Sequence, residues 1–289
     1  MIGYLYALAS SIFIAVANIS AKEALRHEHS MEFSVFAGII AFFIMLPFAP
    51  WVDFGINYYY LGIIYLSSAF AAFGFFFFSR ALRHMDVSVV IPLANISIIF
   101  TAVFGIVVLG EWLSLPKIFG IGLIVIGAYL MEINHGHLDW IYPFREFYHS
   151  RYLHYLFFGS VAISVAAIFD RVALKEVDVI SFMFFSHVFL AANCLLIYIF
   201  LHKEPVRKAI KEAKGSLGWA LSFSVSRLIS AFLFAYAISL IYVSLAYALK
   251  RMSTLVSVFL AGKIFHEKHI EWKIFASLLM VAGAMFIVL

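Results

Sequence analysis

The sequence predicts an all-α integral membrane protein with ten transmembrane helices, arranged as two inverted five-helix repeats. Three observations predict this fold. Hydrophobic residues make up 65% of the 289-residue chain and charged residues only 12%, whereas soluble domains carry about 25% charged residues; the mean hydropathy is accordingly high, at +1.02. Apolar runs of transmembrane length recur along the whole chain. The second half of the sequence also repeats the first.

Five apolar runs occupy the first half, and each is long enough for a helix to cross a hydrocarbon core of about 30 Å. The first run contains Ala15-Val16-Ala17, which resembles a signal-peptide cleavage site, but it lacks the basic n-region of such peptides. The fourth run contains Pro92, which has no backbone N–H and is expected to break or kink its helix. The five predicted helices cover about 2–21, 32–50, 58–79, 87–110 and 115–132.

Five further runs follow a loop at 133–151. The seventh run contains the single cysteine, Cys194, which excludes an internal disulfide and is expected to pack against apolar neighbours. In the fifth run, Gly120, Gly122 and Gly127 favour close approach of a neighbouring helix. The predicted helices of the second half cover about 152–174, 179–201, 217–240, 243–264 and 271–289.

The two halves repeat each other at a nearly constant offset. At 149 residues, 11–25 aligns with 160–174, so the N-terminal run has a counterpart inside the chain and is expected to be retained. At 156 residues, the offset aligns Glu111 with Glu267, Lys117 with Lys273 and Gly127 with Gly283. Five helices per repeat invert the second half, which is typical of secondary transporters, although another duplicated membrane protein is an alternative. The expected units are a first repeat at 1–132, a connecting loop at 133–151 and a second repeat at 152–289.

Three basic residues lie inside apolar runs: Arg227 in the eighth, and Lys250 and Arg251 in the ninth. Each costs about 2.5–3.5 kcal/mol at a helix centre, so they are expected to face a water-filled cavity or a partner. No Asp or Glu lies deep in the last four runs. The cations therefore predict a site for an anionic substrate group, a carboxylate or a phosphate. The alternative is that they snorkel or are neutralised by backbone carbonyls.

Uncharged polar residues lie at similar depth and complete the predicted site. His187 is in the seventh run, and Tyr247 shares a helix face with Lys250, Thr254 and Ser257. Asn18 and Asn95 are deep amides of the first half, which line the site or form helix–helix hydrogen bonds. Lys250 is also a candidate for alternate binding of a proton and a carboxylate, which would couple transport to pH.

Histidine clusters do not predict a metal site. The clusters all lie at segment ends or in loops, where solvated histidines are expected. They are His27-Glu28-His29, His135 with His137, and 266–269. No Ser–His–Asp arrangement or carboxylate pair occurs at membrane depth. We therefore expect no enzyme, no cofactor, no metal and no nucleic-acid partner.

Residues 80–130 resemble the EamA repeat of the drug/metabolite transporter superfamily through Arg80-Ala81-Leu82, Pro92 and Gly110-Glu111. Residues 245–270 resemble the second such repeat, with Glu267 in the place of Glu111. The resemblance implies ten helices, a central cavity, alternating access and export of amino acids or other metabolites. Distant relatives carry sugar phosphates and bind phosphate with a basic pair on the ninth helix, which Lys250 and Arg251 resemble.

The favoured hypothesis is a secondary transporter of a small organic anion or amino acid in a prokaryotic cell (inner) membrane. It would act as a monomer or homodimer among membrane lipids, with proton or counter-substrate coupling. One alternative is a flippase or carrier for a phosphate-bearing lipid or sugar phosphate. The other is a regulatory or scaffold subunit, in which Asp170 or backbone carbonyls pair with the basic side chains. Orientation stays open, because loop charges place both termini outside whereas the resemblance implies that they lie inside.

Overall fold

Helices make up the regular structure of the computed structural model, which describes residues 2–109, 114–132, 149–201, 216–240 and 243–288. No strand occurs within these ranges. A 3₁₀ helix, η1, extends α2. The helices are α1 (Ile2–His27), α2 (Ser30–Met45), η1 (Leu46–Trp51), α3 (Tyr58–His84), α4 (Val87–Leu93), α5 (Ile96–Leu109), α6 (Leu115–Glu132), α8 (Arg151–Ala173), α9 (Val179–Leu201), α11 (Leu217–Leu240), α12 (Val243–Phe265) and α13 (Ile270–Val288).

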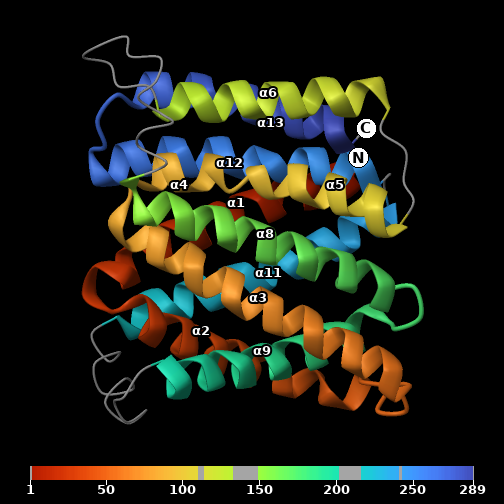
Figure 1. Ribbon diagram of the computed structural model, residues 1–289. Helices are drawn as coiled ribbons and strands as arrows, with labels where there is room; N and C mark the ends of the chain where they lie inside the picture. Colours follow the sequence, from red (N-terminus) through yellow and green to blue (C-terminus); the bar gives the residue numbers. More distant parts are fainter. Residues whose placement is uncertain (1, 110–113, 133–148, 202–215, 241–242, 289) are drawn as a thin grey trace.

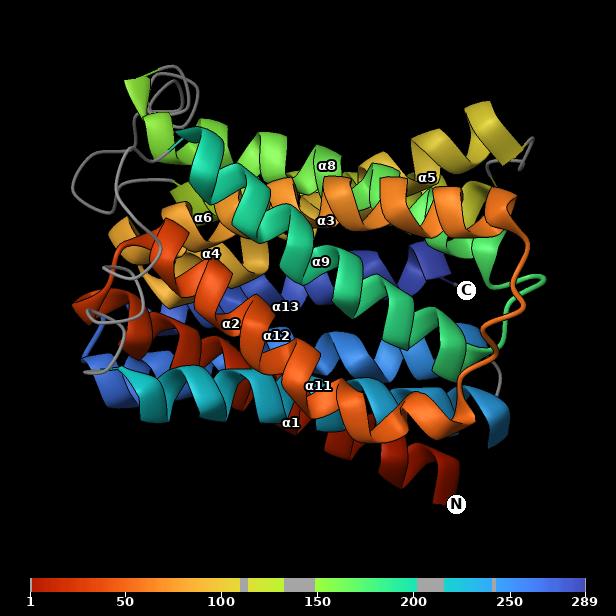
Figure 2. The same ribbon diagram turned by 90° about the horizontal axis from the view of Figure 1, so that it is seen from below.

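The long helices run side by side, with both chain ends at the same end of the bundle (Figure 1). The pair α6 and α13 forms one edge of the bundle, and α2 and α9 form the opposite edge. Viewed after a 90° turn, α3, α5 and α8 lie on one side while α1, α11 and α12 lie on the other (Figure 2). The bundle therefore has two layers of helices.

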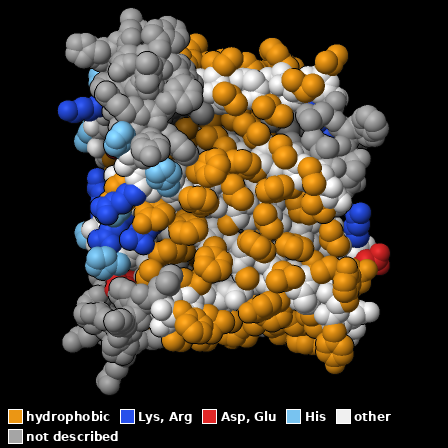
Figure 3. Space-filling model, in the orientation of Figure 1, with side chains coloured by type: hydrophobic (Ala, Val, Ile, Leu, Met, Phe, Trp, Pro, Cys, Tyr) orange, Lys and Arg blue, Asp and Glu red, His pale blue; other side chains and the backbone are white. Residues whose placement is uncertain are grey.

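Seven helical segments in the described ranges are long and apolar enough to cross a membrane. Hydrophobic side chains cover the face between the two ends of the molecule (Figure 3). The chain is therefore an integral membrane protein. The ten-helix arrangement stays a prediction, because several of the remaining segments are shorter within the described residues. The seven segments are Ile2–His27, Ser30–Trp51, Tyr58–His84, Val87–Gly105, Arg151–Ala173, Val179–Phe200 and Leu217–Phe234.

Two helices extend beyond their predicted ends. We expected the first and third helices to end near 21 and 79, but α1 continues to His27 and α3 to His84. Both extensions place basic residues in the last helical turn. Cations there interact favourably with the carbonyl end of the helix dipole. The apolar runs therefore marked the membrane core and not the whole helix.

The fourth predicted helix is broken, as Pro92 led us to expect. Helix α4 ends at Leu93 and α5 begins at Ile96, so Ala94 and Asn95 form the break. Pro92 is fully buried and lacks the N–H that a continuous helix would need. The backbone nitrogen of Asn95 bonds instead to the carbonyl of Pro92, at 2.9 Å. The break sets the Asn95 side chain inside the bundle.

Small residues allow the closest helix contacts. A Cβ added at Gly283 in α13 would lie 2.5 Å from the carbonyl oxygen of Gly120 in α6, and one at Gly127 would lie 2.9 Å from that of Ala276. The expected packing role is therefore confirmed for Gly127. A Cβ at Gly122 would meet nothing within 4 Å, so the expectation is wrong for that position.

Candidate functional site

Arg227 lies on the inward face of α11. It follows Phe223 by four residues and precedes Phe234 by seven, and these two phenylalanines are buried. The opposite face of α11 carries the exposed side chains of Leu221, Val225 and Ile229. Arg227 is nevertheless exposed. The exposed side chain of Arg227 thus lies among buried residues of this helix face.

Aromatic rings surround the Arg227 guanidinium. Its central carbon lies 5.6 Å from the ring centre of Phe75 and 5.9 Å from that of Phe223. These two rings are stacked at 5.7 Å, and Phe33 lies 5.2 Å from Phe223. Among the described residues, no carboxylate forms an ion pair with Arg227. The ring faces stabilise the cation while its N–H groups keep their capacity to bind an anion.

His187 in α9 lies close enough to Arg227 for the guanidinium charge to act on its ring. Its Nδ1 is 2.7 Å from the carbonyl oxygen of Met183. A carbonyl only accepts hydrogen bonds, so Nδ1 is the protonated nitrogen. In the neutral ring, Nε2 is then a hydrogen-bond acceptor. The site thus offers a cationic donor and a neutral acceptor.

Cys194 lies about two helical turns after His187 in α9. Its side chain is buried, as expected, and it lines a small hollow of about 10 Å³. That volume holds at most one water molecule. The hollow is therefore a packing defect and too small for a substrate.

The predicted polar face of α12 is directed inward. Thr254 and Ser257 are buried, and the Lys250 ammonium lies 4.0 Å from the ring centre of Phe234. Phe234 is seven residues from Arg227, which corresponds to about 10 Å along α11. Lys250 and Arg227 therefore lie at two levels beside the same helix, and they do not meet.

Both predicted amides contact this polar face. The Asn18 amide of α1 donates to the Ser257 hydroxyl at 3.0 Å, and the Asn95 amide donates to the Thr254 hydroxyl at 3.3 Å. These bonds join α1 and the α4–α5 break to α12. The helix–helix role that the sequence left open is thus present, and a substrate role for Asn18 and Asn95 stays a prediction.

Two further predicted residues, Tyr247 and Arg251, have side chains outside the described part of the structure. Their roles stay predictions. Asp170, a possible internal partner for the cations, instead accepts a hydrogen bond from the Ser67 hydroxyl of α3. Within the described residues no ion pair joins Asp170 to Arg227.

A polar network at the α3–α4 junction was not predicted. The Lys22 ammonium of α1 donates to the carbonyls of Leu82 and Met85, at 2.8 and 2.7 Å, and so caps α3. Glu267 accepts from the backbone nitrogens of Val87 and Ser88, at 3.0 and 3.2 Å, and so caps α4. The repeat gave a signal for it, because Lys22 aligns with Arg171 and Glu267 with Glu111.

Lys273 in α13 completes this network. Its ammonium lies 2.6 Å from a carboxylate oxygen of Asp86 and 3.7 Å from one of Glu267. The network therefore joins α1, α3, α4 and α13 at the end of the bundle opposite the termini.

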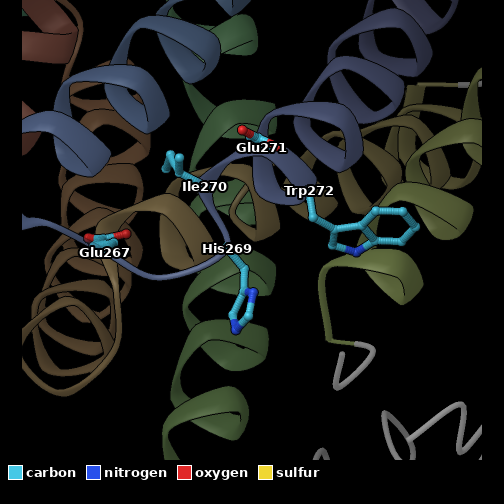
Figure 4. A pocket seen from close by; sticks show the side chains of 5 residues that line it. All are labelled: Glu267, His269, Ile270, Glu271 and Trp272. Carbon is cyan, nitrogen blue, oxygen red and sulfur yellow. The ribbon is translucent and has the colours of Figure 1, made fainter. Parts of the chain in front are cut away.

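A surface hollow of about 330 Å³ lies beside this network, at the start of α13. Figure 4 shows that its side chains diverge: Glu267 and Trp272 lie on opposite sides, and His269 and Glu271 point in opposite directions. Trp272 donates to the carbonyl of Leu130 at 2.8 Å. Because its polar groups do not converge, this hollow is not the candidate site.

Comparison with known proteins gives one family and one fold. The model of the EamA-like transporter family matches residues 1–133 and 151–289. Among 21 matching chains of solved structures, one described only as "Crystal structure of protein" has 16% sequence identity and a TM-score of 0.55. That match covers 98% of this chain and 95% of the other, and at this identity it shows a similar fold alone. Comparison with curated proteins found no match.

Proposed function

This chain belongs to the EamA-like transporter family, and from that premise we propose that it is a secondary transporter of a small organic anion or amino acid. Family membership makes it a membrane transporter of small solutes. The proposal adds the substrate class, the binding residues and alternating access between two inverted halves.

One observation carries the substrate class: an exposed arginine on the inward face of α11 with aromatic neighbours and no described carboxylate partner. A charge within a membrane-spanning bundle is stable only when it is paired or hydrated. Arg227 is therefore the proposed anchor for the substrate's acidic group, bound through two parallel N–H donors. Lys250, about two helical turns away, is proposed to be a second binding residue for the acidic group as the substrate crosses the protein.

The neighbours of Arg227 support a more specific substrate. The nearly buried rings of Phe33, Phe75 and Phe223 make the surroundings of the guanidinium apolar, and Nε2 of His187 offers an acceptor to an N–H or O–H group. An acid that carries an apolar side chain and an adjacent amine or hydroxyl fits all three features.

Matching contacts in the two layers support the inverted repeat. Ser10 and Ser230, where α1 meets α11, each donate a hydroxyl to the other's carbonyl at 2.9 Å. Their repeat counterparts are Gly159 and Gly74, which lie against each other where α8 meets α3. Gly127 and Gly283 are also counterparts and face each other's helix. A two-fold relation between 1–132 and 152–289 accounts for all of these pairs.

The test is ligand-induced stabilisation of purified protein, followed by uptake into proteoliposomes. Carboxylates, amino acids, sugar phosphates and polyprenyl phosphates would be screened against wild type, Arg227→Gln and Arg227→Lys. A charge-assisted hydrogen bond contributes about 1.5–3 kcal/mol, so Arg227→Gln should weaken acid binding about 10- to 100-fold. Arg227→Lys should retain part of the affinity because it keeps the positive charge. It should not restore all of it, because lysine lacks the planar pair of N–H donors that binds a carboxylate through two hydrogen bonds.

Arg26→Gln is the control, since Arg26 is an arginine of α1 that already pairs with Glu23 at 3.2 Å. It should bind and transport as wild type does. If Arg227→Gln binds the acid as tightly as wild type, the anchor is wrong. If polyprenyl or sugar phosphates alone stabilise the protein, the phosphate carrier replaces the acid transporter as the function.

A further inference from the structure

A cluster of cations lies where α3 ends and α8 begins, away from the proposed transport site. Arg80, Arg83 and His84 are in the last turns of α3, and Arg151 is the first residue of α8. Four cationic side chains act on the His84 ring: Arg83, Arg151, Arg80 and Lys22. The cluster therefore concentrates positive charge at one end of two membrane-spanning helices.

Two tyrosines of α8 form a platform beneath these cations. The guanidinium carbon of Arg80 lies 4.8 Å from the ring centre of Tyr155, and that of Arg151 lies 5.1 Å from the ring centre of Tyr152. The His84 ring stacks on Tyr152 at 4.4 Å. The tyrosine rings are themselves 6.3 Å apart. One continuous aromatic surface thus positions three cationic or titratable groups.

No acid among the described residues forms an ion pair with the cluster. Other cations at this end of the molecule are paired, as Arg26 is with Glu23 and Lys273 with Asp86. Within the described residues, no ion pair joins Arg80, Arg83 or Arg151 to a carboxylate. Planar guanidinium groups with unused donors match the oxygens of a phosphate.

The same helix faces become apolar toward the membrane centre. On α3, Phe73 and Phe77 precede Arg80 by seven and three residues, and on α8, Phe158 follows Arg151 by seven. Phe73 and Phe158 are exposed. The surface therefore presents cations at the end of the helices and aromatic rings below them, the order in which a phospholipid presents its phosphate and its acyl chains.

We propose that the α3–α8 seam is a binding site for an anionic phospholipid, with the headgroup phosphate held by Arg80 and Arg151. The acyl chains lie over Phe73 and Phe158. A free phosphate would satisfy the cations and leave the exposed rings unused, so the lipid accounts for both parts of the surface. Close contact of Gly74 with Gly159 holds the two helices together below the headgroup, so a bound lipid would bridge a preformed seam.

Native mass spectrometry of the detergent-purified protein tests the site. Phosphatidylglycerol, phosphatidylcholine and soluble glycerol 3-phosphate would be titrated separately into wild type and into the double variant Arg80→Gln/Arg151→Gln. Wild type should bind phosphatidylglycerol about tenfold more tightly than phosphatidylcholine, which corresponds to about 1.4 kcal/mol. The double variant should bind the two lipids equally.

The matched control is Lys263→Gln/Lys268→Gln, which removes two exposed charges at the same end of the molecule but outside the seam. It should keep the wild-type preference. Equal binding of the two lipids by wild type overturns the proposal without any variant, and so does a preference that survives in the double variant. Binding of glycerol 3-phosphate as tight as that of phosphatidylglycerol overturns the lipid assignment. Arg227→Gln should bind lipid normally, so this proposal and the transport proposal fail separately.

Discussion

Glu28, in the turn between α1 and α2, is a buried acid without a hydrogen-bond partner among the described residues. Only 2% of its surface is exposed, and Glu32, also buried, lies nearby. Burial, and then the negative charge of Glu32, raises the pKa of Glu28 to about 7. The flanking His27 and His29 are exposed, as the sequence led us to expect, but the burial of Glu28 between them was not foreseen.

This raised pKa predicts a falling stability as pH rises. Between about 4.5 and 7, the folded protein holds a proton on Glu28 that the unfolded chain releases. The contribution is therefore fully present below pH 4.5 and is lost as pH rises through 7, at about 1.4 kcal/mol per pKa unit. Glu28→Gln should flatten the dependence of Tm on pH between 5 and 8. Glu271→Gln, which removes an exposed carboxylate, should keep the wild-type slope, and an unchanged slope in Glu28→Gln would contradict the assignment.

The residues of the candidate site were only partly predictable. Arg227 and Lys250 stand out because charges are rare in apolar runs. Phe75 and Phe223 do not stand out, because they are two of 33 phenylalanines. Which rings meet the guanidinium depends on how α3 packs near α11, helices separated by more than 130 residues in the chain, and no local pattern carries that information.

At the scale of the helix, Glu267 has the role of an N-cap supplied from a distant loop. Helix α4 is preceded by Asp86, whose side chain makes no capping bond and reaches Lys273 instead. Glu267→Ala should therefore remove the acceptor for Val87 and Ser88, and destabilise the protein by about 1–2 kcal/mol, as other lost caps do.

Glu271→Ala is the matched control, because Glu271 lies four residues further on and is exposed. Thermal unfolding of the two variants in the same detergent makes the comparison. Equal unfolding temperatures would show that the cap contributes little to stability.

The contact between α6 and α13 gives a sharper test, because an alanine is expected to clash at Gly283 and to fit freely at Gly122. Gly283→Ala would place a methyl group 2.5 Å from a backbone oxygen, which cannot be relieved by a side-chain movement. We expect a loss of about 1–3 kcal/mol, typical of overpacked interiors. Gly122→Ala meets nothing and should be neutral or slightly stabilising. A Gly283→Ala protein as stable as wild type would contradict the observed helix separation.

Helices were easier to predict than their ends. Every apolar run corresponds to helix in the described ranges, because a backbone in lipid must satisfy its own hydrogen bonds. The end of α3 was missed because it depends on capping by a remote group: the Lys22 ammonium closes α3 from another helix. Pro92 gave a correct local signal, since its effect on the helix is covalent.

At the scale of the whole molecule, the basic residues gather at one end. Lys, Arg and His side chains crowd the left edge in Figure 3, opposite the chain termini. The cations described at that end are Lys22, Arg26, Arg80, Arg83, Arg151, Lys263, Lys268 and Lys273. Those described at the end that holds the termini are Lys117, Arg171 and Lys175. Positively charged ends of membrane proteins face the cytoplasm.

This asymmetry predicts that both termini lie outside the cell, against the expectation that the family resemblance raised. Lys175 and Lys268 are exposed lysines at opposite ends of the bundle. In intact cells, a membrane-impermeant maleimide should label Lys175→Cys, and should label Lys268→Cys only after permeabilisation. The native Cys194 is buried and should give little background. The reverse labelling would place the termini inside, and would mean that the cationic end, including the α3–α8 seam, faces the outer leaflet.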